Sequence, residues 1–82
     1  MKQFLLKRCG NASLTGFELV ADILENYTYP IKLNDVYKEL GKKYKLTYYA
    51  VESRIRNYKE VCGYKDISNH EFISILMIEA EN

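Results

Sequence analysis

Apolar residues recur at intervals of three and four along most of this chain, which is the period of an amphipathic helix rather than of a strand. The pattern predicts helices over residues 2–9, 16–27, 33–44, 48–62 and 69–80. The first segment is the shortest, and a small strand or hairpin over residues 4–8 is its alternative interpretation. We therefore expect an all-α fold, a small bundle of four to five helices.

Capping and stop signals flank these segments. Gly10 and Gly63 follow predicted helices, and glycine adopts the left-handed conformation that ends a helix without steric cost. Thr47 is a favourable N-cap for the fourth helix. Residues 15–18 and 68–71 each fit a capping box, in which a hydroxyl accepts from a backbone N–H and a glutamate returns the bond. These signals support the helical interpretation independently of the apolar period.

The third and fourth predicted helices each have a defined apolar face. In the third helix the stripe comprises Leu33, Val36, Tyr37, Leu40 and Tyr44, and in the fourth it comprises Val51, Ile55, Tyr58 and Cys62 with Tyr48 beside them. Gly41 lies inside the third helix, where glycine costs about 1 kcal/mol relative to alanine. We expect Gly41 to permit close approach by a neighbouring helix.

Length and composition place the chain among small soluble domains. It has 82 residues, of which 48% are hydrophobic and 28% charged, so we expect one domain over residues 1–82. The sequence contains no membrane-spanning run and no signal peptide, which predicts a cytoplasmic protein without membrane contact. Cys9 and Cys62 lack the spacing of a metal-ligand pair, and we expect two reduced thiols that fill core space.

Basic residues are concentrated around the third and fourth helices, although the net charge is only +1. Two helices joined by a short turn are the outline of a helix-turn-helix, whose second helix enters the major groove of DNA. On a helical wheel, the polar face of the fourth helix carries the predicted base-facing residues Tyr49, Glu52, Ser53, Arg56 and Asn57. The predicted phosphate-facing residues are Lys38, Lys42, Lys43, Thr47 and Lys59.

The chemistry of this face suits base recognition. Arginine can bond guanine O6 and N7 together, glutamate can accept from the cytosine amino group, and asparagine can pair with adenine. Lysines on the preceding helix suit phosphates, which position a protein without specifying sequence. The alternative interpretation is a solvated polar face stabilised by pairs such as Glu52 with Arg56, four residues apart.

Residues 32–61, KLNDVYKELGKKYKLTYYAVESRIRNYKEV, resemble the DNA-binding C-terminal domains of the stage-zero sporulation master regulators. The shared elements are Lys42-Lys43-Tyr44, Thr47, Val51-Glu52, Ile55-Arg56 and Glu60-Val61. The resemblance extends to residues 4–24 and 68–81, and so covers most of the chain. It implies an all-helical domain that contains a helix-turn-helix, binds DNA and regulates transcription, with Glu52 and Arg56 facing the groove.

The chain departs from that family in three respects. Ala50 and Ser53 stand where the family has arginines, and the loss of such contacts, worth about 1–3 kcal/mol each, would change or weaken specificity. The link over residues 63–67 is shorter than in the family, and we expect no receiver domain that would be switched by aspartyl phosphorylation.

The last predicted helix is apolar on nearly every side. We expect Ile73 and Met77 to form an association surface for a homodimer or a protein partner. With a single histidine, His70, and no phosphate-binding loop, the sequence predicts no enzyme, cofactor, metal or small-molecule substrate. Our leading hypothesis is a regulator that binds double-stranded DNA. The alternative is a protein-interaction module, such as a small inhibitor or accessory factor, in which DNA binding has been lost.

Overall fold

The computed structural model describes residues 1–10 and 15–81, and every regular element within them is an α-helix. The elements are α1 (Lys2–Cys9), α2 (Thr15–Asn26), α3 (Leu33–Tyr44), α4 (Tyr48–Val61) and α5 (Asn69–Glu81). The expected all-α class is confirmed, and the strand alternative over residues 4–8 is wrong. The predicted boundaries of α1 and α3 agree with the structure, and those of the other helices differ by one residue.

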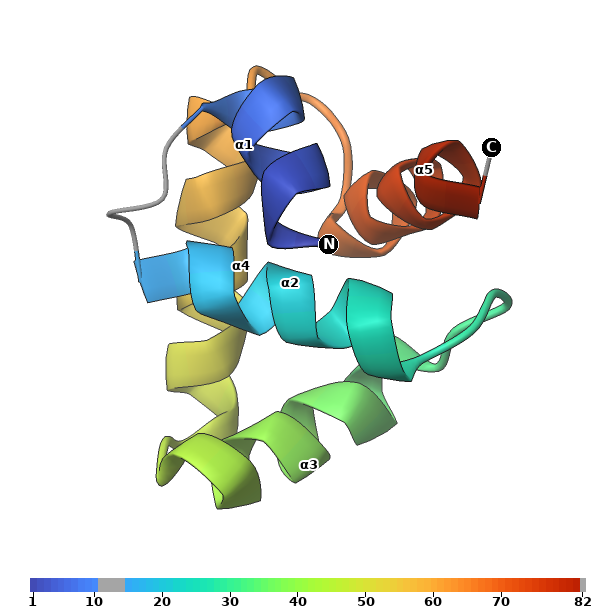
Figure 1. The fold of residues 1–82 in the computed structure, drawn as a ribbon. Helices are drawn as coiled ribbons and strands as arrows, with labels where there is room; N and C mark the ends of the chain where they lie inside the picture. The colour runs from blue at the N-terminus through green and yellow to red at the C-terminus, as the bar shows by residue number, and fades with distance from the viewer. Residues whose placement is uncertain (11–14, 82) are drawn as a thin grey trace.

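Helix α4 is the central element of the bundle. In Figure 1, α4 stands upright behind α2. Helix α3 lies below α2, and α1 and α5 lie above α2. Helix α4 contacts α2, α3 and α5, and its side chains Val51, Ile55 and Tyr58 are fully buried. The apolar face predicted for this helix therefore points into the core, which leaves the opposite face at the surface.

Helices α2 and α4 cross at Gly16. A Cβ atom built on Gly16 would overlap the backbone oxygen of Arg54 and would lie 2.7 Å from Tyr58 Cβ. Gly41 serves a different purpose from the one that we expected. Its missing Cβ would lie 2.7 Å from the Leu46 oxygen, so it accommodates the turn that follows α3 rather than a neighbouring helix.

Most predicted helix ends are confirmed. Gly10 and Gly63 have left-handed backbone angles, with φ of 70° and 91°, and Thr47 Oγ1 accepts from the Ala50 N–H at 3.0 Å. In the second predicted capping box, Ser68 Oγ accepts from the Glu71 N–H at 3.1 Å.

The first predicted capping box is wrong. Thr15 lies within the helix that it was expected to precede. The Glu18 carboxylate pairs with Lys2 Nζ at 3.0 Å, and among the described residues it accepts no bond from the start of its own helix.

The two cysteines form a disulfide, which corrects the expectation of reduced thiols. Cys9 at the end of α1 is bonded to Cys62 just after α4, with their Cα atoms 4.8 Å apart. Fifty-three positions separate them in the sequence, so only the packing of α1 against the end of α4 brings the two sulfurs together. Disulfides are uncommon in reducing compartments, and the cytoplasmic location stays a prediction.

Helix α5 packs its apolar side chains inward. Ile73 is fully buried and Met77 is only 4% exposed, so neither contributes to a surface, and the association surface expected on them is wrong. The helix contacts both α2 and α4, which explains why more than one of its sides is apolar. Tyr44, which we expected in the core, is instead 37% exposed.

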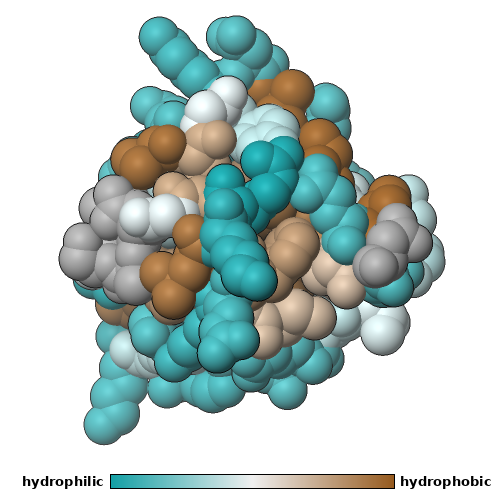
Figure 2. Space-filling model, turned by 45° about the horizontal axis from the view of Figure 1, so that its top comes forward, coloured by the Kyte–Doolittle hydropathy of each residue, from teal (hydrophilic) through white to brown (hydrophobic). Residues whose placement is uncertain are grey.

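The surface carries apolar groups in several separate places. With the α1 side turned forward, Figure 2 shows apolar side chains interrupted by hydrophilic ones. The large exposed apolar side chains are Met1, Leu6, Tyr29, Tyr44, Tyr49, Val61 and Ile78. No helix within the described residues is long and apolar enough to cross a membrane.

Candidate nucleic-acid interface

Residues 45–47 connect α3 to α4 in a tight turn. Lys45 adopts a left-handed conformation with φ of 56°, and the Leu46 N–H donates to the Gly41 oxygen at 2.8 Å. This bond reverses the chain immediately after α3, and Thr47 then caps the new helix. The turn is therefore specified by local hydrogen bonds on both sides.

Aromatic contacts fix the start of α4 against α3. The Tyr48 hydroxyl donates to Asn34 Oδ1 at 2.7 Å, and the Tyr37 and Tyr48 rings meet edge to face with centroids 5.3 Å apart. Tyr49 leans on Tyr48 in the same manner at 5.5 Å. Because these contacts span both helices, α3 and α4 form one unit with a defined relative orientation.

The outward face of α4 carries the residues that the helical wheel placed there. Tyr49 is 78% exposed, Arg56 and Asn57 are exposed, and Ser53 and Glu52 are half-buried. An exposed tyrosine, arginine and asparagine supply donors, acceptors and an apolar ring suited to base edges in a major groove.

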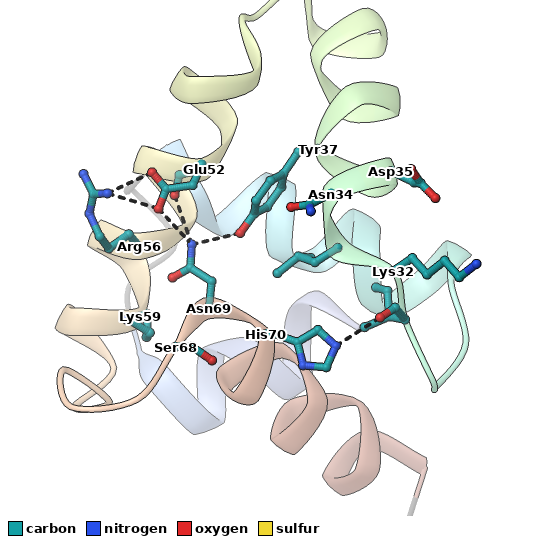
Figure 3. A pocket seen from close by; sticks show the side chains of 12 residues that line it. Lys32, Asn34, Asp35, Tyr37, Glu52, Arg56, Lys59, Ser68, Asn69 and His70 are labelled. Atoms are coloured by element: carbon teal, nitrogen blue, oxygen red, sulfur yellow. Dashed lines mark hydrogen bonds and ion pairs between the residues drawn. The ribbon is translucent and has the colours of Figure 1, made fainter.

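A polar network lies beneath Arg56 (Figure 3). The Nη1 atom of Arg56 lies 2.8 and 3.0 Å from the two carboxylate oxygens of Glu52, and the Nη2 atom of Arg56 donates to Ser53 Oγ at 3.3 Å. Asn69, the first residue of α5, donates through Nδ2 to the Tyr37 hydroxyl at 2.9 Å and to Glu52 Oε2 at 3.3 Å. Three helices thus meet below a single exposed guanidinium.

A hollow of about 760 Å³ lies beside this network. It is bounded by the first turn of α3, the middle of α4 and the first turn of α5, and Glu52, Arg56 and Asn69 line one side of it. On the other side, His70 Nε2 makes a hydrogen bond with the Ile31 oxygen at 3.0 Å. Burial raises the pKa of the Tyr37 hydroxyl to about 12, so this group remains neutral at physiological pH.

The predicted phosphate-facing lysines fall into three groups. Lys38 and Lys42 are exposed on α3, and no described residue pairs with either side chain. Lys43 is exposed as well, but its Nζ lies 2.5 Å from Asp22 Oδ2. Lys59 is only 6% exposed and donates to the Ile67 oxygen at 2.5 Å, so its predicted phosphate-facing role is wrong.

Thr47 is the remaining member of the predicted phosphate-facing set. Its side-chain oxygen is occupied by the cap of α4, but the residue itself is exposed. Its hydroxyl proton is therefore the group that it can still offer to a phosphate.

The roles of two residues near the interface were not predicted from the sequence. Asn69 was visible only as a member of a capping segment, and Asp22 only as one of several acidic residues outside the basic region. Glu52 and Tyr37 lie 17 and 32 positions from Asn69, and the α3 partners of Asp22, Lys43 and Tyr44, lie 21 and 22 positions from it. Periodicity describes neighbours on one helix, so it contains no signal for such contacts.

Among the described residues, no group of three or more potential ligand side chains is placed to hold a metal ion. The arrangement instead offers an exposed arginine with defined partners and a neighbouring tyrosine and asparagine. It also offers two lysines on α3 whose side chains pair with no described residue. Comparisons with models of known protein families, with characterised proteins and with solved structures find no match to this chain.

Proposed function

We propose that this protein binds double-stranded DNA with α3 and α4 acting as a helix-turn-helix, and that it regulates transcription. The observation that carries the proposal is the outward face of α4. It presents Tyr49, Arg56 and Asn57 to solvent on a helix whose orientation is fixed by α3. A rigid helix with an exposed polar face is what major-groove recognition requires.

Each group has a defined task in this proposal. Arg56 pairs with guanine and Asn57 with adenine, while Tyr49 contacts a thymine methyl group or a sugar. Lys38 and Lys42 contact phosphates beside the groove, because they are exposed on α3 and phosphate contacts set register rather than sequence. The resemblance to the sporulation master regulators supports a groove-facing position for Glu52 and Arg56.

The test is a titration of fluorescently labelled random duplex DNA, followed by anisotropy at several salt concentrations. We expect affinity to fall steeply as salt rises, since phosphate contacts release counterions. Lys42→Ala should lower the salt slope by about 1. Lys7→Ala is the matched control, because Lys7 is an exposed lysine on α1, at the opposite end of the molecule from α3 (Figure 1).

A second function, protein interaction without DNA binding, is favoured by the internal neutralisation of the basic groups. Arg56 is paired with Glu52, and Lys43 with Asp22, so part of the positive charge near α3 and α4 is already compensated. No anisotropy change at low salt would reject DNA binding and leave this second function. In that case Tyr49→Ala should weaken capture of a protein partner, since Tyr49 is the most exposed of the large apolar residues.

A further inference from the structure

We propose that Glu52 and Asn69 are positioning residues that orient Arg56 toward one guanine, and that neither reads a base itself. This inference rests on the proposed DNA-binding function and assigns that function a mechanism of specificity. It also changes the role of Glu52, which the sequence placed among the base-facing residues.

Glu52 has both carboxylate oxygens engaged within the protein. Oε1 accepts from Arg56, and Oε2 accepts from Arg56 and from Asn69. These three bonds use most of the roughly four lone pairs of a carboxylate, and a cytosine amino group would compete with charge-assisted bonds, which are stronger than bonds between neutral groups. The carboxylate is therefore better suited to hold the guanidinium than to contact a base.

The donors of Arg56 can be counted. A guanidinium has five N–H groups in one plane. Glu52 occupies the Nη1 side with two short contacts, and Ser53 takes one N–H of Nη2. The Nε–H and one N–H of Nη2 have no partner among the described residues. A guanidinium with two free donors can bond the O6 and N7 acceptors of guanine.

Asn69 ties this arrangement to the rest of the fold. Its Nδ2 reaches the Glu52 carboxylate, the Glu52 backbone oxygen and the Tyr37 hydroxyl, so it joins α5 to both α4 and α3. Its Oδ1 is buried and has no hydrogen-bond partner among the described residues. A buried acceptor without a partner is unfavourable. The orientation of this amide is therefore fixed by its donor side, which faces Glu52 (Figure 3).

The experiment begins with the wild-type protein and a random duplex pool, from which the preferred sequence is selected. Each base pair of that sequence is then changed and the affinity measured. We expect one G·C pair at which wild type discriminates by about 5- to 150-fold and at which Arg56→Ala discriminates hardly at all. Asn69→Ala and Glu52→Gln should each reduce discrimination at that same pair by at least about threefold, and should add nothing to Arg56→Ala, because they act through it.

Two further readouts separate positioning from a general structural effect. Glu52→Gln should raise the affinity for random duplex DNA while it lowers discrimination, because it removes a negative charge beside the phosphates. Asp35→Asn is the matched control for Glu52→Gln, since it also removes a carboxylate charge. Asp35 lines the same hollow, but its side chain pairs with no described residue, so discrimination at the G·C pair should be retained.

The outcomes are distinguishable. If wild type binds no duplex at low salt, the proposed function fails and the inference fails with it. If wild type selects a sequence but Asn69→Ala and Glu52→Gln discriminate as wild type does, DNA binding stands and the positioning role is overturned. If Asn69→Ala does not fold, Glu52→Gln alone tests the positioning role: reduced discrimination supports it, and discrimination equal to that of wild type overturns it.

Discussion

Lys43 Nζ lies 2.5 Å from Asp22 Oδ2, and this ion pair joins the last turn of α3 to the middle of α2. Asp22 is 7% exposed, and it also accepts from the Tyr44 hydroxyl at 2.5 Å and from Asn26 Nδ2 at 2.9 Å. The carboxylate thus anchors the end of the helix that leads into the turn before α4. Correct placement of the proposed recognition helix depends on a residue of another helix.

We predict that Asp22→Asn lowers the free energy of unfolding by about 1–3 kcal/mol at pH 7, because a buried group loses charge-assisted partners. Urea denaturation at pH 7 measures the loss. Asp35→Asn is the control, since Asp35 is exposed and its side chain pairs with no described residue. An equal loss in both variants would contradict a specific role for Asp22.

The same carboxylate predicts a dependence on pH. Burial raises the pKa of Asp22, but hydrogen bonds from Lys43, Tyr44 and Asn26 and the charge of Lys43 outweigh burial, so the pKa lies below its ordinary value of 3.8. A lowered pKa in the folded state stabilises the protein above the unfolded value and loses that contribution as pH falls. The difference in stability between wild type and Asp22→Asn should therefore be largest above pH 3.8 and shrink as pH falls through the lowered pKa.

Reduction of the Cys9–Cys62 disulfide should destabilise the protein. The bond closes a loop of 53 positions, for which loop-closure entropy predicts about 4 kcal/mol of stabilisation. Urea denaturation with and without dithiothreitol measures this difference, and Cys9→Ser should match the reduced wild type. Alkylation followed by mass spectrometry provides the independent check. Labelling of both cysteines without reductant would contradict the disulfide.

Lys59 and Lys42 should behave in opposite ways. Lys59→Ala removes a buried stem and the donor to the Ile67 oxygen, so we expect a loss of about 1–3 kcal/mol in stability and no change in the salt slope of DNA binding. Lys42→Ala should lower that slope by about 1 and leave stability unchanged. Urea denaturation and anisotropy titrations measure the two quantities. A reduced slope for a folded Lys59→Ala would restore Lys59 to the phosphate-facing set.

Gly16→Ala should destabilise the protein, although glycine to alanine within an exposed helix usually stabilises by about 1 kcal/mol. The added Cβ would meet the Arg54 oxygen and Tyr58 Cβ, and separating α2 from α4 should cost about 1–3 kcal/mol. Thermal unfolding followed by circular dichroism gives the sign. A higher midpoint for the variant would show that the helices can move apart at little cost.

The exposed face of α4 illustrates what periodicity predicts well. Val51, Ile55 and Tyr58 were assigned to the core and are fully buried, so Tyr49 and Arg56 had to lie on the other side. The Glu52–Arg56 pair was also predicted, because the two residues lie four positions apart on one helix. The caps at Thr47 and Ser68 were accessible because each bond spans only three positions.

The chain's helices, most of their ends and the outward side of α4 were determined by the sequence alone, because each depends on residues within one or two turns of one another. The tertiary structure decided which partners those side chains found. It joined Cys9 to Cys62, placed Ile73, Met77 and Lys59 in the interior, and brought Asn69 to Glu52 and Asp22 to Lys43. Such contacts depend on how whole helices pack, and a helical period records only which face is apolar, not which helix will cover it.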